Sequence, residues 1–160
     1  MTAIGIASML LLAGCSSNLS HLAATTKVAS LAPAQPTTPA PRSGKGNLDG
    51  LILRYADAYD VPSALIHRVV VRESGYNASA RNGPYYGLMQ ISYATAKSMG
   101  YKGSPAGLLD PDTNLKYAVK YLRGAYVVGG GNQDQAVRLY ARGYYYDAKR
   151  QGLLEEAGLR

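Results

Sequence analysis

Glu73 is the residue in this sequence whose position best suits acid–base chemistry. It follows four apolar residues that recur at helical spacing: Leu65, Ile66, Val69 and Val70. Because Glu73 comes four residues after Val69 and seven after Ile66, it falls on or beside the same helical face. A carboxyl group pressed toward a core loses hydration, which disfavours its charged form and raises its pKa. We therefore predict a protonated carboxylic acid that serves as a general acid near neutral pH.

The segment after Glu73 has the composition of a loop that faces a cleft. Gly75 suits the position just past a helix end, where a positive φ is common. A run of turn-forming residues follows, and the chain returns at 85–90. Gly87 allows a close approach to the backbone, and Gln90 offers an amide donor and an acceptor. An acid at a helix end beside such a loop is typical of a sugar-binding cleft.

The carboxyl groups of the sequence favour a single catalytic acid. Only three glutamates occur, and two of them, Glu155 and Glu156, lie near the C-terminus. Glycosidases that use two carboxyl groups place them roughly 5–10 Å apart. No second glutamate lies near Glu73 in the sequence, so a one-acid mechanism is the simpler interpretation. A distant aspartate that folds into range is the alternative. His67 lies on a different helical face, and we expect it to be structural or exposed.

Two blocks of residues together resemble a known family. They are Glu73-Ser74-x-Tyr76-x-x-x-Ala80 and Gly87-Leu88-Met89-Gln90-Ile91. In combination they resemble the lytic transglycosylase SLT family, relatives of goose-type lysozyme, over about residues 48–146. The resemblance implies a mainly α, lysozyme-like single catalytic domain. It also implies cleavage of the β-1,4 bond between N-acetylmuramic acid (MurNAc) and N-acetylglucosamine (GlcNAc) without water. The muramyl C6 hydroxyl attacks instead and gives a 1,6-anhydro product.

The resemblance also implies roles for the residues of the site. Glu73 is expected to be the sole catalytic acid and base, with no metal and no cofactor. Four residues are expected to bind the sugars: Tyr86, Met89, Gln90 and Tyr140. Ser74 is expected either to orient the carboxyl group of Glu73 or to cap its helix. Sequence pattern alone favours a core position for Tyr140, whereas the resemblance points its hydroxyl at the catalytic acid.

The sequence departs from the family pattern in two places. The segment between Ala80 and Gly87 is one residue shorter than usual and has Asn82 where the family has serine. The later Tyr-Asn-x-Gly motif appears as Tyr140-Ala141-Arg142-Gly143, without its asparagine. Both departures concern substrate contacts, and their effect on binding is left open at this point.

Helices must position these residues, and the sequence predicts their approximate bounds. The expected N-caps are Ser92, Asp110 and Asn132, and Pro62 is expected in the first turn of its helix. The predicted helices span 48–59, 62–73, 92–99, 111–128, 132–142 and 144–156, with an interruption near Gly152 and a further helical turn at 105–109. No strand of useful length is predicted.

The N-terminus predicts export and a lipid anchor. Residues 4–13 form an apolar run that is too short to span a bilayer, and residues 1–14 have the features of a signal peptide. The end of this segment, Leu12-Ala13-Gly14-Cys15, resembles the lipobox of bacterial lipoproteins, in which the cysteine is acylated. An incidental cysteine is the alternative. No lysine or arginine precedes the apolar run, so the true start codon is left open.

The segment 15–46 is expected to hold the lipidated Cys15 and a linker rich in Pro, Ala and Thr, followed by the catalytic domain at 47–160. At ~3.1 Å per residue of polyproline II, some 30 residues reach at most ~90 Å. Ser16 rather than aspartate follows Cys15. By resemblance to lipoprotein sorting in diderm bacteria, this favours the outer membrane, facing the periplasm.

The net charge of +7 bears on the partners of the protein. No basic run and no helix-turn-helix pattern points to nucleic acid, and an exported protein rarely meets it. Peptidoglycan carries lactyl and peptide carboxylates, and we expect this polymer as the partner of a basic monomer. The 14 tyrosines and the absence of Trp and Phe mean that tyrosine must both pack the core and line any cleft.

Two other functions fit the same sequence. One is a hydrolytic muramidase on the same fold, and the other is a non-catalytic peptidoglycan-binding lipoprotein whose altered loop has lost activity. The sequence leaves open endo or exo action, the preferred glycan or peptide form, and the physiological process served.

Overall fold

Six α-helices, one 3₁₀ helix and three two-residue strands make up the part of the chain that the structure describes. The structure is a computed structural model that describes residues 45–159, with side chains from residue 47. The predicted signal peptide, Cys15 and the linker up to residue 44 lie outside the described residues. In chain order the elements are α1 (Lys45–Tyr59), α2 (Ser63–Ser74), β1 (Arg81–Asn82), β2 (Tyr85–Tyr86), β3 (Ile91–Ser92), α3 (Tyr93–Ser98), η1 (Pro105–Leu109), α4 (Pro111–Val128), α5 (Gln133–Arg142) and α6 (Tyr145–Gln151).

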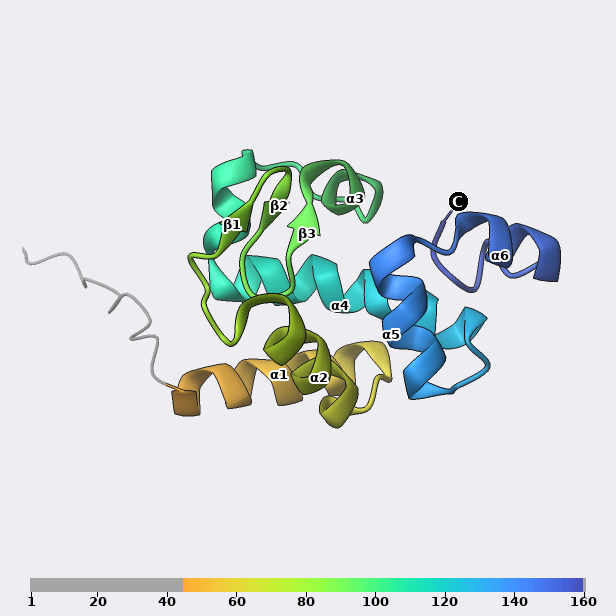
Figure 1. Ribbon diagram of the computed structural model, residues 1–160, viewed down its shortest axis with the longest axis horizontal. Coiled ribbons are helices and arrows are strands. Elements are labelled where there is room, and N and C mark those ends of the chain that lie inside the picture. Colours follow the sequence, from red (N-terminus) through yellow and green to blue (C-terminus); the bar gives the residue numbers. More distant parts are fainter. Residues whose placement is uncertain (1–44, 160) are drawn as a thin grey trace, which may run out of the picture. The chain divides into compact units, whose positions relative to one another are not determined.

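Helix α4 lies at the centre of the described fold. It packs against α1, α3, α5, α6 and η1, and Figure 1 shows it crossing the middle of the view, between α1 and the small sheet. Its predicted apolar stripe is fully buried and consists of Leu115, Ala118, Val119 and Leu122. The prediction of a mainly α domain is therefore confirmed, with the core formed around one helix.

Helix starts coincide with the predicted capping residues. The side chains of Ser92, Asp110 and Asn132 each accept a hydrogen bond from the backbone N–H group three residues later. Such bonds satisfy N–H groups that a helix leaves without internal partners. Gly75 ends α2 in the left-handed conformation, with φ 57° and ψ 36°, as predicted.

Other helix ends differ from the prediction. Helix α1 already begins at Lys45, before the predicted start at residue 48. Pro62 is the N-cap of α2 rather than part of its first turn. Helix α6 stops at Gly152, which has a φ of 73°, so the chain continues to Glu156 in turns instead of helix. None of the described helices is long and apolar enough to cross a bilayer.

A three-stranded antiparallel sheet is present where the sequence predicted no strand. Its strand order is β1-β2-β3, and Tyr85 pairs with Ser92 while Tyr86 pairs with Ile91. Gly83 takes a φ of 56° in the turn between β1 and β2, a conformation that favours glycine in two-residue hairpin turns. Each strand has two residues, which is too short for an alternating pattern to be recognised in the sequence.

Candidate active site

Glu73 lies in the last turn of α2, at the edge of the core. The four apolar residues that precede it on this helix, Leu65, Ile66, Val69 and Val70, are all buried. They hold α2 against the core, so the next turn brings Glu73 to the core boundary. Its side chain is 24% exposed and lines a cavity.

Two opposing effects act on the carboxyl group of Glu73. Burial removes water from it and raises its pKa, while the positive charge of Arg72 lowers the pKa by a smaller amount. Nε of Arg72 lies 3.7 Å from Oε1 of Glu73. The net result is a pKa above that of an ordinary glutamate. Glu73 therefore keeps its proton to a higher pH than an exposed carboxyl group, which is what a general acid requires.

Residues 87–90, here called the groove loop, form a tight turn between β2 and β3. Gly87 and Gln90 both have positive φ, 71° and 47°. The side-chain amide of Gln90 donates hydrogen bonds to the carbonyl oxygens of Gly87, at 2.9 Å, and Ala80, at 3.1 Å. A Cβ at Gly87 would lie 2.3 Å from Nδ2 of Asn114. The close approach predicted at this glycine is thus to the protein's own helix α4.

Hydrogen bonds from three helices hold the groove loop. The hydroxyl of Ser74, in α2, donates to the carbonyl oxygen of Leu88 at 2.7 Å. The N–H of Met89 donates to Oδ1 of Asn114, in α4, at 3.0 Å. The hydroxyl of Tyr140, in α5, donates to the carbonyl oxygen of Met89 at 2.8 Å. Because each bond comes from a different helix, the loop is constrained from three directions.

Tyr140 combines the two roles that the sequence left open. It is buried, as a core residue would be, and it also lines the cavity that Glu73 faces. Burial raises the pKa of its phenol well above the ordinary value, and the negative charge of Glu73 adds to this increase. The hydroxyl is directed at the carbonyl oxygen of Met89, so Tyr140 supports the groove loop beside the acid.

A groove begins at Glu73. Its first part is a cavity of about 270 Å³ lined by Arg72, Glu73, Asn82, Tyr85, Gln90, Tyr140 and Ala141. The second part is a cavity of about 200 Å³ that shares four of these residues, Tyr85, Gln90, Tyr140 and Ala141. It continues past β3 and α3 to residues 142 and 143. We call these two cavities together the groove.

The predicted sugar-binding residues divide into two groups. Gln90 and Tyr140 line the groove beside Glu73. The side chain of Met89 has no exposed surface, and Tyr86 is only 8% exposed; neither lines the groove. The hydroxyl of Ser74 bonds to the groove loop, and it is a link between helix and loop rather than a cap.

Tyr85 lines the groove in the place expected for Tyr86, and sequence reasoning missed it. Strand neighbours point to opposite faces, and the register places Tyr86 opposite the buried Ile91 and Tyr85 opposite Ser92. Tyr85 is 46% exposed. The apolar residue at 91 and the polar residue at 92 were the available signal, but they become informative only once the strand pairing is known.

Glu73 is the sole carboxyl group among the described residues that line the groove. Three described aspartates are engaged elsewhere in ion pairs: Asp112 with Arg54, Asp134 with Arg68, and Asp147 with Arg142 and Arg150. The geometry therefore offers one acid in the groove.

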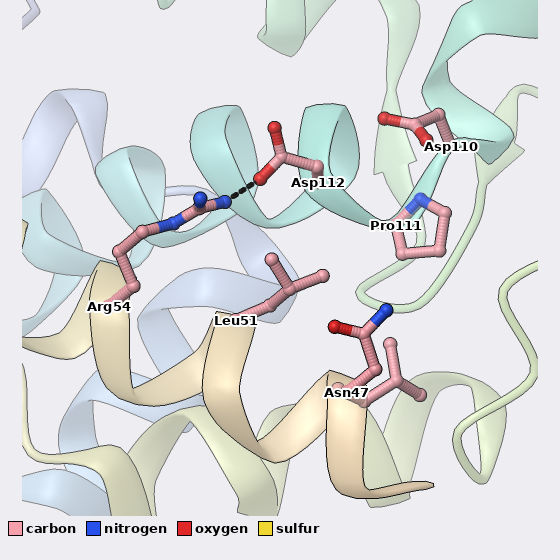
Figure 2. A pocket seen from close by; sticks show the side chains of 7 residues that line it. Asn47, Leu51, Arg54, Asp110, Pro111 and Asp112 are labelled. Atoms are coloured by element: carbon pink, nitrogen blue, oxygen red, sulfur yellow. Dashed lines mark hydrogen bonds and ion pairs between the residues drawn. The ribbon is translucent and has the colours of Figure 1, made fainter. Parts of the chain in front are cut away.

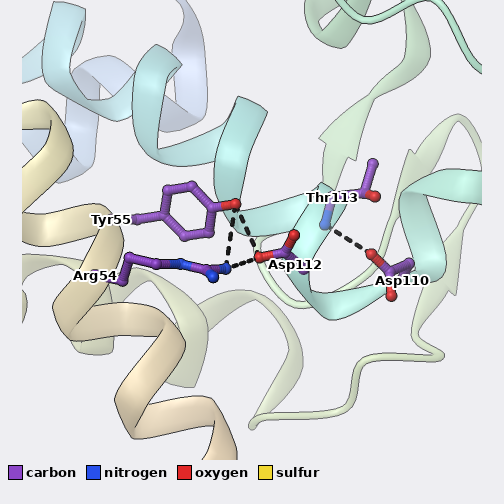
Figure 3. Close-up of polar contacts among 5 residues, drawn as sticks. All are labelled: Arg54, Tyr55, Asp110, Asp112 and Thr113. Carbon is purple, nitrogen blue, oxygen red and sulfur yellow. Dashed lines mark hydrogen bonds and ion pairs between the residues drawn. The ribbon is translucent and has the colours of Figure 1, made fainter. Parts of the chain in front are cut away.

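A separate hollow of about 480 Å³ lies between α1 and the start of α4 (Figure 2). Its two carboxylates already have structural partners, as Figure 3 shows. Asp112 binds Arg54 and accepts a hydrogen bond from the hydroxyl of Tyr55 at 2.9 Å. Burial, together with these contacts to Asp112, raises the pKa of Tyr55 to about 12. Asp110 caps α4 through the N–H of Thr113. Both carboxylates of this hollow are thus engaged in structural contacts, so Glu73 marks the better candidate site.

Comparison with known proteins finds a similar solved structure. A structure of the 70 kDa soluble lytic transglycosylase SLT70 from Escherichia coli is similar, with 27% sequence identity and a TM-score of 0.56. The likeness covers 68% of this chain but only 18% of that chain, so it concerns one part of a larger protein.

The family model for the transglycosylase SLT domain matches residues 50–153. This range includes Glu73, the groove loop, α5 and α6, and it makes up more than half of the 160 residues. The chain therefore belongs to the transglycosylase SLT domain family.

Proposed function

We propose that this protein is a lytic transglycosylase that cleaves the glycan strands of peptidoglycan. The observation that supports this best is Glu73, which has a raised pKa and is the one carboxyl group among the described residues that line the groove. Family membership and the likeness to SLT70 support the same activity. The substrate bond is the β-1,4 linkage between MurNAc and GlcNAc.

In the proposed mechanism Glu73 performs both proton transfers. The protonated carboxyl group first donates its proton to the glycosidic oxygen as the bond from that oxygen to the anomeric carbon of MurNAc breaks. GlcNAc leaves with a free hydroxyl. The C6 hydroxyl of the same MurNAc then attacks the anomeric carbon and gives its proton to the Glu73 carboxylate. The product is 1,6-anhydroMurNAc, and the acid is restored without water.

Positive charge that develops on the sugar ring needs compensation. The groove offers no second carboxylate among its described lining residues. We therefore assign this task to the acetamido oxygen of the substrate, as in substrate-assisted glycosidases. Gln90 and Tyr140 support the groove loop, and Tyr85 presents an exposed aromatic ring at the groove. We propose that these residues orient the sugars.

The two alternatives are separated by products. A hydrolytic muramidase on the same fold would yield reducing ends, which are heavier than the anhydro product by one water. A non-catalytic binding protein would yield no soluble fragment. Mass spectrometry of digests of purified glycan strands distinguishes all three, and reducing ends alone would contradict the non-hydrolytic reaction.

The first prediction concerns Glu73→Gln. The amide cannot donate or accept the proton as required, so we expect the rate of product release to fall by about 10²–10⁴-fold, the usual contribution of a general acid or base. Glu156→Gln, at an exposed position near the C-terminus, is the matched control and should retain full activity. Equal activity in Glu73→Gln and wild type would remove Glu73 from the mechanism.

We also propose where the enzyme acts. The signal peptide at 1–14, lipidation of Cys15 and the linker that follows would attach it to the outer membrane, facing the periplasm. The proline-rich linker suits this arrangement because it spaces the domain from a membrane surface. We propose a monomer with peptidoglycan as its macromolecular partner.

A further inference from the structure

The groove continues beyond the part that holds Glu73. A third cavity, of about 560 Å³, lies over α6 and the segment that precedes it. It shares four lining residues with the second cavity: Thr95, Tyr121, Arg142 and Gly143. Its remaining lining residues are Ser98, Tyr144, Tyr145, Tyr146, Asp147, Arg150 and Leu159. We call this third cavity the α6 cavity. A polymer bound across Glu73 can therefore extend to α6.

Exposed tyrosines mark this extension. Five large apolar side chains are exposed in the described part of the chain, and three of them are tyrosines. Tyr85 lines the groove, whereas Tyr145, at 48% exposure, and Tyr146, at 73%, line the α6 cavity. The rings of Tyr145 and Tyr146 pack edge to face, with centroids 5.4 Å apart. All three exposed tyrosines thus border one continuous depression, as expected of a binding surface.

Two arginines give the α6 cavity a positive charge. Arg142 and Arg150 both contact Asp147, at 3.0 Å and 2.5 Å. The side chain of Asp147 is 15% exposed, whereas those of Arg142 and Arg150 are 61% and 69% exposed. One largely buried carboxylate therefore positions two exposed guanidinium groups. Together these three side chains give the lining of the α6 cavity a net charge of +1. Each contact uses one nitrogen of a group that carries five N–H donors.

We propose that the α6 cavity binds the carboxylate-bearing stem peptide of the glycan strand whose bond lies at Glu73. This inference rests on the proposed function. Arginine pairs with carboxylates through parallel hydrogen bonds, and tyrosine and arginine are the residues most enriched in binding hot spots. The tyrosine rings provide apolar surface for the peptide beside the two cations. A strand stripped of its peptides keeps only the lactyl carboxylate at each MurNAc ring, whereas a stem peptide carries further carboxylates away from the ring, where they can reach the two arginines.

The test measures binding separately from catalysis. In the Glu73→Gln background, we compare the Kd of soluble glycan strands that carry stem peptides with the Kd of strands from which an amidase has removed them. We expect the peptide-bearing strands to bind more tightly. Adding Arg150→Gln should reduce this preference by about fivefold, the scale of an exposed ion pair, and Arg150→Lys should restore part of it.

Arg138→Gln is the matched control, because Arg138 is an exposed arginine of α5 outside the three cavities and contacts Gln135. This variant should keep the full preference. Equal Kd values for the two kinds of strand, or a preference that survives Arg150→Gln, would overturn the inference. Absence of product from wild type in the separate activity assay would instead contradict the proposed function, so the two failures are distinguishable.

Discussion

The protonation of Glu73 couples the chemistry of the site to the stability of the fold. A carboxyl group on a side chain that is only 24% exposed is useful as an acid because its charged form is poorly hydrated. The same poor hydration makes its ionisation unfavourable in the folded protein. The positive charge of Arg72 offsets part of this effect. The pKa of Glu73 is therefore raised above that of a surface carboxylate, but by less than burial alone would raise it.

A prediction at the residue scale follows from the raised pKa of Glu73. Below the ordinary glutamate pKa, Glu73 is protonated in both the folded and the unfolded chain. Its ionisation then has no effect on the free energy of unfolding. Between the ordinary and the raised value the folded chain binds more protons, so stability falls as pH rises through this window. Glu73→Gln removes the effect, and we expect its melting temperature to match wild type near pH 3 and to exceed it at pH 7. Calorimetry across this range is the measurement.

Glu156→Gln serves as the control for that experiment, since its side chain is exposed. Its melting temperature should follow that of wild type at every pH. A difference between Glu73→Gln and wild type that stays constant from pH 3 to pH 7 would show that Glu73 ionises as an ordinary carboxyl group.

Single residues also show what the sequence could and could not predict of the site. The position of Glu73 at the boundary of the core follows from helical spacing alone. The choice between Tyr85 and Tyr86 does not, because it depends on strand register. Met89 lies within a motif that pointed to sugar contact, yet its side chain is fully buried. Its backbone N–H and carbonyl bond to Asn114 and Tyr140. A motif residue can thus matter through its backbone, which its side-chain type does not reveal.

At the element scale, Asn114 joins three segments. It is the buried polar residue of the described core, with no exposed surface. Its Oδ1 accepts from Met89, and its Nδ2 donates to the carbonyl oxygens of Tyr86 and Leu108 at 2.8 Å each. The side chain therefore ties α4 to the sheet, the groove loop and η1. The sequence around Asn114 does not indicate these partners, because they lie in segments that only the fold brings together.

We predict that Asn114→Asp destabilises the protein by about 3 kcal/mol or more. A carboxylate cannot donate, so it would leave two buried carbonyl oxygens unpaired at about 1–3 kcal/mol each and would bury a charge. Asn132→Ala removes a cap from α5 and should cost only about 1 kcal/mol. Urea denaturation measures both values. Similar losses in the two variants would contradict the role assigned to Asn114.

Elements were predictable to different degrees. Caps and apolar stripes are local, so the starts of α3, α4 and α5 follow from residues within one helical turn. The sheet depends on pairing between strands of two residues each, and the local sequence pattern does not predict this pairing. The end of α6 at Gly152 shows a further limit, because a glycine can either interrupt a helix or end it.

At the scale of the whole molecule, the proposed anchor makes a prediction of its own. Cys15→Ser removes the thiol that would carry the lipid, so we expect the protein to move from the membrane pellet to the soluble fraction. Enzyme activity should persist, since Glu73 and the groove belong to residues 47–160. Ser16→Asp keeps the cysteine and should remain membrane-bound. Retention of Cys15→Ser in the pellet would argue against lipidation at this position.

The groove loop has a consequence for heat inactivation. Its hydrogen bonds end on α2, α4 and α5, which also form the core. Each of these helices supplies one support of the loop, so we expect the loop to lose its shape when the helices separate. Catalytic activity and helical structure would then be lost at the same temperature. We expect no intermediate in which the core is folded while the active site is disordered.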